Sequence, residues 1–259
     1  MIKALIFDFV QTLGDAASGY KDGEKNAQVK LMEKLEITDS EKFMEQFREI
    51  RKKHFLASDF NRKNQWLELQ ALYGKNLGDE FLDKLADEYW QFVIDAMKLF
   101  PEAEDVIRDL KKSYKLGLIC NSQRDGSTRA LQSPEFERAC KYFDSYILSG
   151  TDGIPAKPDP APFNMMLENL GVKADEAIYI GDDYRVDIEG AHGAGIKCVW
   201  LKHYSVKRNW PENTFGVPEI TDLRELIKEG MEIFGRARRP GAPRRARRSR
   251  PTITRISGS

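Results

Sequence analysis

The chain has 259 residues, of which 41% are hydrophobic, so it is long enough to bury a core in one large α/β domain or two modest ones. No apolar run is long enough to span a bilayer, and the first residues lack a secretory pattern. The three cysteines, Cys120, Cys140 and Cys198, have unrelated spacings that predict neither a disulfide framework nor a zinc site. We therefore expect a cytoplasmic protein with no membrane partner.

The formal net charge of zero hides two oppositely charged parts. Residues 236–259 carry nine arginines and no acid, which leaves 32 basic against 41 acidic groups in residues 1–235. A body with a charge near −9 is not typical of a nucleic-acid binder, so no nucleic-acid partner is expected. The tail has little to bury and is predicted to be disordered. Its Arg/Ala/Pro monotony and Ser-Gly-Ser end are typical of vector-encoded residues, although a basic arm for RNA or an acidic surface is the alternative.

Residues 2–8 form an apolar run that predicts a first strand, and residues 21–98 then change to long, charged segments with helical periodicity. Two apolar stripes at helical spacing predict packing between helices of this block. They consist of Phe43, Phe47 and Ile50, and of Phe81, Leu85, Tyr89, Phe92 and Ala96.

After Pro101 the strand and helix patterns alternate. Strands are predicted near 116–120, 146–148, 177–181 and 197–200, and helices near 102–113, 127–141, 161–170, 184–194 and 222–234. This alternation predicts an α/β fold with a doubly wound, Rossmann-like parallel sheet. Residues 1–14 and 99–235 would form that core, residues 15–98 a helical cap over the strand ends, and residues 236–259 the tail.

Acidic residues follow two of the predicted strands. Asp8 ends the first, and Gly181-Asp182-Asp183, with Asp187 shortly after, ends a later one. Carboxyl ends of parallel strands meet at the crevice where such sheets bind ligands, and repelling carboxylates there stay ionised only beside a cation. This density of acids suits Mg²⁺. The plainer interpretation, that Asp183 or Asp187 caps the next helix, is compatible with it.

Two other stretches offer groups that could hold an anion. Lys157 lies in the proline-stiffened loop Ala156-Lys157-Pro158-Asp159-Pro160, where a fixed ammonium could hold a phosphate, although most such lysines are only solvated charges. Asn121 and Ser122, just past a predicted strand, offer amide, hydroxyl and backbone N–H donors.

In order and spacing these stretches resemble the haloacid dehalogenase-like (HAD) hydrolase superfamily, over about residues 1–235. The resemblance implies Asp8 as nucleophile, Lys157 as the clamp on phosphate and nucleophile, and Mg²⁺ as cofactor on Asp8, Asp182 and the backbone carbonyl of Val10. Thr12, Asn121 and Ser122 are the candidate substrate-binding residues, and we expect supporting roles for Asp183 and Asp187. The position of the helical insert is similar to that in members with a cap after the first motif.

The sequence departs from the family pattern at three positions. Val10 replaces the Asp that, in the family's phosphatases, protonates the leaving group, a contribution worth about 10²–10⁴ in rate. Gln11 replaces a usual Gly, and Cys120 stands where Ser or Thr is common. None of these changes removes the predicted magnesium site, because a backbone carbonyl survives any side-chain change.

Three functions remain open. The first is a Mg²⁺-dependent phosphatase that acts on a small phosphorylated metabolite through an aspartyl-phosphate on Asp8. The second is a 2-haloacid dehalogenase, whose relatives also lack the second Asp, or a phosphonate hydrolase with a cap lysine. The third is a weakly active or non-catalytic binding protein. We expect a small anionic substrate and a monomer or homodimer. Cap residues that could face the site are Lys52, Lys53, His54 and Arg62.

Overall fold

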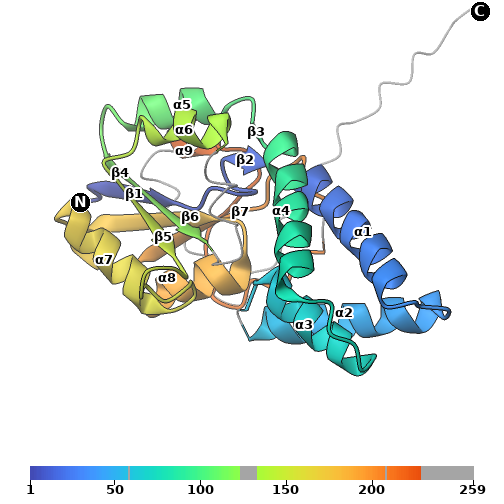
Figure 1. Ribbon diagram of the computed structural model, residues 1–259. Coiled ribbons are helices and arrows are strands. Elements are labelled where there is room, and N and C mark those ends of the chain that lie inside the picture. Colours follow the sequence, from blue (N-terminus) through green and yellow to red (C-terminus); the bar gives the residue numbers. More distant parts are fainter. Residues whose placement is uncertain (58, 123–132, 208, 229–259) are drawn as a thin grey trace, which may run out of the picture.

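A six-stranded parallel sheet forms the centre of the molecule, as the computed structural model describes it for residues 1–57, 59–122, 133–207 and 209–228. The strand order is β5-β4-β1-β6-β7-β8 (Figure 1). This confirms the predicted α/β fold with a parallel sheet. The strands are β1 (Ala4–Phe7), β4 (Lys115–Asn121), β5 (Ser145–Ser149), β6 (Ala177–Gly181), β7 (Lys197–Leu201) and β8 (Glu219–Ile220).

The first strand lies in the middle of the sheet. Phe7 of β1 pairs with Leu118 of β4 on one side and with Ile180 of β6 on the other. All four residues of β1 are buried, which explains why the strand reads as an uninterrupted apolar run. Because the three strands are parallel, the residues that follow them emerge at one edge, and this is where an open α/β sheet binds ligands.

Helices cover both faces of the sheet (Figure 1). On one face lie α5 (Ala103–Leu110), α6 (Pro134–Cys140) and α9 (Glu225–Lys228). On the other lie α7 (Pro160–Leu170) and α8 (Glu189–Gly193). Each face has its own apolar cluster, and the one beneath α7 and α8 contains Ile6, Phe163 and Tyr179. None of the described helices is long and apolar enough to cross a membrane.

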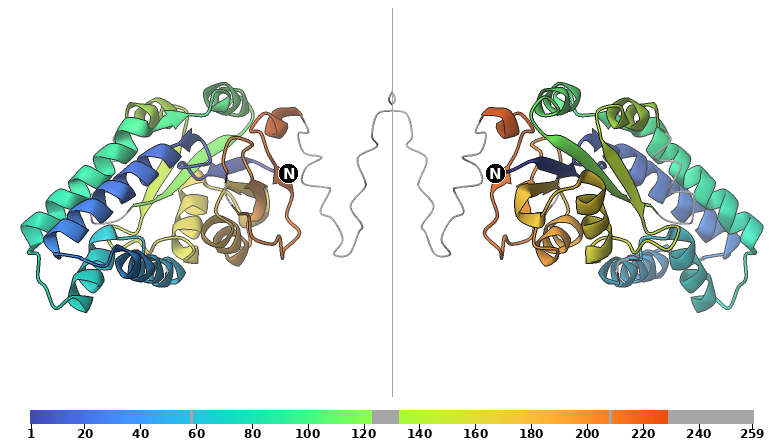
Figure 2. Two further views of the ribbon diagram at one scale, coloured as in Figure 1. Left: turned by 90° about the vertical axis from the view of Figure 1, so that its right-hand side faces the viewer. Right: turned by 90° about the vertical axis from the view of Figure 1, so that its left-hand side faces the viewer.

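Four helices occupy the chain between β2 (Gly14–Asp15) and β3 (Lys98–Leu99), and together we call them the helical insertion. They lie beyond the carboxyl ends of the sheet strands, with α1 and α4 side by side (Figures 1 and 2). The helices are α1 (Ala17–Lys34), α2 (Ser40–Leu56), α3 (Arg62–Leu72) and α4 (Asp79–Ala96). Their role as a separate cap, with the boundaries given above, stays a prediction.

The predicted stripe on α4 was wrong at one position. Phe92 is 38% exposed, whereas the next residue, Val93, is buried. Helix α4 packs on α1 and α3 together, so its apolar face is wider than one three-to-four-residue stripe. The buried residues are Leu82, Leu85, Ala86, Tyr89, Trp90 and Val93. The stripe on α2, with Phe43, Phe47 and Ile50, is buried as predicted.

Two short strands that the sequence did not reveal join the insertion to the sheet. β2 and β3 pair antiparallel, and Phe100 donates a backbone hydrogen bond to Leu13 at 2.9 Å. The junction is fixed by a buried pair, in which Glu102 lies 2.8 Å from Nε2 of His203 and the imidazole stacks on the ring of Phe100. The predicted helices 127–141 and 222–234 and the tail 236–259 fall wholly or partly outside the described residues.

Close packing of α1 on α4 depends on Gly19. A Cβ at this position would lie 2.4 Å from the carbonyl oxygen of Phe92 and 2.7 Å from Cα of Val93. Both are backbone atoms, which cannot move aside as a flexible side chain would.

We expect Gly19→Ala to lower the free energy of unfolding by about 1–3 kcal/mol through overpacking. In an uncrowded helix the same change would raise it by about 1 kcal/mol, because Ala has the higher helix propensity. Urea denaturation followed by circular dichroism measures the difference. The exposed neighbour Ser18→Ala is the control and should stay within about 0.5 kcal/mol of the wild type. A stabilised Gly19→Ala variant would contradict the packing of α1 on α4.

Candidate functional site

The ammonium group of Lys157 lies at the centre of the site. Its Nζ donates to Oδ1 of Asp8 at 2.8 Å and to Oδ1 of Asp187 at 2.7 Å. It also lies 2.9 Å from the carbonyl oxygen of Ile119 and 2.9 Å from the hydroxyl of Tyr179. The lysine is 1% exposed, so these contacts replace its hydration. The structure thus brings Asp8, Lys157 and Asp187 together, from segments up to 179 positions apart.

Burial and charge act in opposite directions on these groups. Burial raises the pKa of Asp8 to about 6, since the nearby Lys157 ammonium only partly offsets the loss of water and the Asp187 carboxylate adds repulsion. Burial alone would lower the pKa of Lys157, but the Asp187 and Asp8 carboxylates raise it well above its ordinary value. The two carboxylates therefore favour the charged form of Lys157.

Asp182 brings a third carboxylate to the same place. It is 4% exposed, and its Oδ1 accepts a hydrogen bond from the hydroxyl of Thr12 at 3.3 Å. One carboxylate oxygen from each of Asp8, Asp182 and Asp187 lies within 4.8 Å of the others. Hard oxygen donors at this density fit Mg²⁺, which binds through one or two carboxylates plus waters and substrate oxygens. The donor set therefore suits the predicted cofactor.

The segment after Asp182 sets the position of Asp187. A one-turn π-helix, Tyr184–Ile188, follows Asp183, whose side chain accepts from the backbone N–H of Val186 at 3.0 Å. Asp183 thus caps this turn, as the plainer interpretation of the sequence held. The backbone N–H of Asp183 donates in turn to Oδ2 of Asp187 at 3.0 Å. At Gly181, a Cβ would lie 2.5 Å from that of Asp187, so only glycine allows this approach.

The turn after Asp8 contains the two atypical residues. Val10 is half-buried against the apolar core and forms an isolated bridge with Gly14. Gln11 has a φ of 64°, a left-handed conformation that costs a residue with a Cβ about 1–2 kcal/mol. Its side-chain amide donates to Asp15 at 3.2 Å. The turn therefore keeps the shape that a glycine would give it.

Asn121 has contacts that differ from the predicted ones. Its Oδ1 accepts from the backbone N–H of Lys157 at 2.8 Å, and its Nδ2 donates to the Lys157 carbonyl at 3.0 Å. This bidentate arrangement holds the lysine loop against β4, so the amide positions Lys157. Ser122 is fully buried, and its backbone N–H donates to Ser149. Substrate binding by Asn121, Ser122 and Thr12 stays a prediction.

Tyr179 is a site residue that the sequence did not reveal. Its hydroxyl donates to Oδ1 of Asp187 at 3.0 Å and accepts from Lys157. The ring is fully buried and packs edge-on against Phe163 at 5.1 Å. In the sequence Tyr179 looks like one more apolar residue of a buried strand. The one signal that could have indicated its role is that this strand is followed directly by acidic residues, which a tyrosine hydroxyl can reach.

Two of the four candidate residues on the helical insertion pair with acidic neighbours. Lys53 is bound to Glu68 at 2.8 Å, and His54 lies 2.9 Å from Asp59 and 3.0 Å from Glu68. Lys52 is exposed. Arg62 alone of the four stacks on an aromatic ring, with its guanidinium carbon 5.2 Å from the centroid of Tyr89.

One contact ties the insertion to the acidic loop. Arg185, two residues after Asp183, donates to the carbonyl oxygen of Phe55 at the end of α2 and lies 5.0 Å above its ring. The insertion is thereby held next to the π-turn that carries Asp187.

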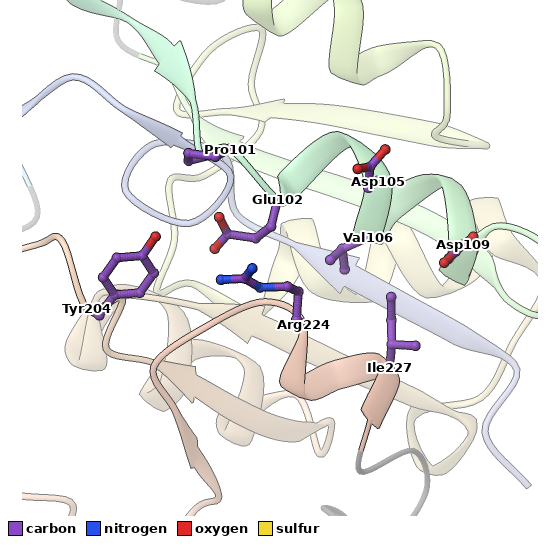
Figure 3. A pocket seen from close by; sticks show the side chains of 8 residues that line it. All are labelled: Pro101, Glu102, Asp105, Val106, Asp109, Tyr204, Arg224 and Ile227. Atoms are coloured by element: carbon purple, nitrogen blue, oxygen red, sulfur yellow. The ribbon is translucent and has the colours of Figure 1, made fainter.

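A cavity of about 370 Å³ lies elsewhere, between α5 and α9 (Figure 3). The described residues that line it include none of the predicted site residues. They are Pro101, Glu102, Asp105, Val106, Asp109, Tyr204, Arg224 and Ile227.

Comparison with known families decides the assignment, since a family model described as haloacid dehalogenase-like hydrolase matches residues 5–201. The chain belongs to this hydrolase family. The hydrolase is 26% identical over 243 residues to glyceraldehyde 3-phosphate phosphatase of Methanopyrus kandleri, covering 90% of this chain and 99% of the relative. It is 32% identical over 132 residues to phosphoserine phosphatase of Thermus thermophilus, covering half of each chain.

Solved structures resemble this hydrolase over nearly the whole chain. The 2-haloacid dehalogenase of Pseudomonas syringae pv. Tomato has a TM-score of 0.59 at 26% identity and covers 91% of this chain and 99% of its own. A HAD phosphatase of Thermococcus onnurineus has a TM-score of 0.61 at 23% identity, covers 90% of this chain and 98% of its own, and supports the fold alone.

The buried ion network predicts a large effect of removing Lys157. We expect Lys157→Met to lower the free energy of unfolding by about 3–5 kcal/mol, since two carboxylates would be left buried without their cation. Urea denaturation in EDTA measures this effect without contribution from a metal. Lys112→Met is the control, because this lysine side chain is 70% exposed in its pair with Asp109 and should change stability by less than about 1 kcal/mol. Equal losses in both variants would contradict the network.

Proposed function

We propose that this hydrolase is a Mg²⁺-dependent phosphatase that acts on a small phosphorylated metabolite through an aspartyl-phosphate on Asp8. The observation that carries the proposal is the cluster of Asp8, Asp182 and Asp187 beside the buried Lys157. Three carboxylates and one ammonium have a net charge of −2, which a divalent cation would neutralise. The phosphatases among the relatives support the same reaction class.

Asp8, Asp182 and the main-chain carbonyl of Val10 would hold the metal, which supplies Lewis-acid neutralisation of charge on the phosphoryl oxygens. A carboxylate oxygen of Asp8 attacks phosphorus, the bond from phosphorus to the leaving oxygen breaks, and the electron pair departs with that oxygen. Water then hydrolyses the aspartyl-phosphate, which restores Asp8 and releases phosphate. Lys157 holds Oδ1 of Asp8 in place throughout.

Val10 has no proton to give to the leaving oxygen. That proton must come from solvent or from the substrate itself, so the first step depends on how well the leaving group carries negative charge. Aryl phosphates, whose leaving groups are weak bases, should therefore react faster than alkyl phosphates.

Haloacid dehalogenase chemistry is the second candidate, favoured by Val10 and by the likeness to the Pseudomonas syringae enzyme. In that reaction Asp8 would attack carbon and displace halide. The Asp182 and Asp187 carboxylates count against it, because without a metal they would repel the carboxylate of a 2-haloacid.

Hydrolysis of an aryl phosphate and of 2-haloacids, each with Mg²⁺ and with EDTA, separates the candidates. We expect phosphate release that requires Mg²⁺ and is abolished in Asp8→Asn. Halide release that persists in EDTA would overturn the phosphatase proposal and favour the dehalogenase. Activity on neither substrate class would favour a non-catalytic binding protein.

The missing acid gives a second test. Val10→Asp should raise kcat by up to about 10²–10⁴-fold, with the larger gain on an alkyl phosphate. Val10→Asn is the matched control, because it adds polarity and bulk without an ionisable group. Steady-state kinetics on one aryl and one alkyl phosphate measure both effects. Equal rates for the Asp and Asn variants would show that acid–base help at this position does not limit turnover.

A further inference from the structure

Trp200, on β7, holds the peptide group that joins the two acids after β6. It lies beside Gly181 in the register of the sheet, and its Nε1 donates to the backbone carbonyl oxygen of Asp182 at 2.8 Å. The next backbone N–H along the chain, that of Asp183, donates to Oδ2 of Asp187 at 3.0 Å. Because this carbonyl and this N–H belong to one planar peptide group, the group is held by a hydrogen bond on each side.

This peptide group sets the direction of the Asp182 side chain. The backbone turns only at the two dihedral angles of each residue, since the peptide group itself is planar. The peptide after Asp182 is held as described, and Gly181, the last residue of β6, holds the preceding chain in the sheet. Cβ of Asp182 therefore has one direction. The Thr12 hydroxyl then orients the carboxylate by donating to its Oδ1 at 3.3 Å.

Trp200 itself has little freedom to move. Its side chain is fully buried, and its ring packs against Tyr184 at 4.7 Å and edge-on against Trp210 at 5.8 Å. The ammonium group of Lys202 lies 3.9 Å from its ring centroid. Tyr184 is the first residue of the π-turn, and its hydroxyl accepts from the backbone N–H of Phe215 at 2.9 Å. The indole is therefore a rigid hydrogen-bond donor.

We propose that Trp200 is a positioning residue for the metal. Through the peptide group after Asp182, it gives the acidic cluster the fixed geometry that favours Mg²⁺ over Ca²⁺. This inference rests on the metal site of the proposed function. Mg²⁺ is the smaller ion and requires near-ideal octahedral geometry, whereas Ca²⁺ accepts about six to eight oxygens in irregular arrangements. Rigid ligands therefore favour Mg²⁺, and ligands that can move lose part of that preference.

Competition against Mn²⁺ tests the inference without turnover. The electron paramagnetic resonance signal of free Mn²⁺ measures how much of this ion the protein binds, and Mg²⁺ or Ca²⁺ displaces it according to its own affinity. We expect Trp200→Phe to weaken Mg²⁺ binding about 10–100-fold, as loss of a partner that orients a ligand typically does. The loss for Ca²⁺ should be smaller, less than about tenfold. Asp182→Asn, which removes a proposed ligand, shows that the displaced ion occupies this cluster.

Trp210→Phe is the matched control for Trp200→Phe. It removes an indole of the same size from the same aromatic group and leaves the hydrogen bond to Asp182 in place. The ratio of the Mg²⁺ and Ca²⁺ affinities should therefore stay as in the wild type. Equal losses for the two ions in Trp200→Phe, unchanged affinities in that variant, or the same change of ratio in the control would overturn the inference.

A measurement on the wild type covers the case in which circular dichroism shows Trp200→Phe to be unfolded. The chain has four tryptophans, and the indole N–H signal of Trp200 in a nitrogen-15 spectrum is assigned by elimination, with Phe at Trp66, Trp90 and Trp210 in turn. We expect Mg²⁺ to shift this signal, because the indole donates to the backbone of a proposed ligand, and Ca²⁺ to shift it less. A Trp200 signal that Mg²⁺ leaves unchanged would overturn the inference.

These outcomes are separate from those of the proposed function. If Mg²⁺ binds with the Trp200-dependent preference but the wild type hydrolyses no phosphate, the phosphatase proposal fails and the inference stands. If the wild type hydrolyses phosphate with Mg²⁺ and Trp200→Phe keeps the full preference for Mg²⁺, the inference fails alone. A wild type that binds no Mg²⁺ overturns both.

Discussion

A single buried ammonium group holds the site together. Lys157 bonds to groups from β4 and β6, to the residue after β1 and to the π-turn after Asp183, so four segments that meet at one edge of the sheet share a cation. Burying one ammonium without partners costs several kcal/mol, and so does burying each carboxylate. These groups can be buried only together. The position of Asp8 is therefore fixed by the whole edge of the sheet and not by its own turn.

The same network explains why the site remains acidic. Lys157 supplies one positive charge for the three carboxylates of Asp8, Asp182 and Asp187, and Asp187 already uses both of its oxygens on Lys157, Tyr179 and the Asp183 backbone. Asp8 and Asp182 supply the other two carboxylates of the cluster, and Asp182 accepts a hydrogen bond from the hydroxyl of Thr12. On the proposed function, the lysine fixes the geometry and the metal would balance the remaining charge.

The sheet and the convergence of its strand ends could be predicted because buried parallel strands read as apolar runs, and the acids that follow them are visible in the sequence. Tyr179 could not, since a phenol that bonds to Lys157 across 22 positions looks like any aromatic residue in a buried strand. Nor could Asn121, whose amide is directed at the Lys157 backbone by the pairing of β4 with β5. On α4, the stripe failed at Phe92 because a helix that contacts two neighbours has a wider buried face. Sequence patterns record which groups are buried, whereas pairing between distant side chains is set by the packing.

The residue at position 10 can contribute in two ways: its main-chain carbonyl can bind a metal, and an acidic side chain there could transfer a proton. A main-chain carbonyl can bind a metal with any side chain attached, so a valine keeps the first contribution and loses proton transfer. Val10 is half-buried against the apolar core, and an aspartate there would add a fourth carboxylate to a site that has one ammonium. Removing that charge lowers the repulsion that Lys157 and a metal must offset, at the expense of the leaving-group proton. On the proposed function, the hydrolase therefore depends more strongly on the chemistry of its substrate than a phosphatase with the second aspartate, and recognition of the substrate by the helical insertion carries a larger share of its specificity.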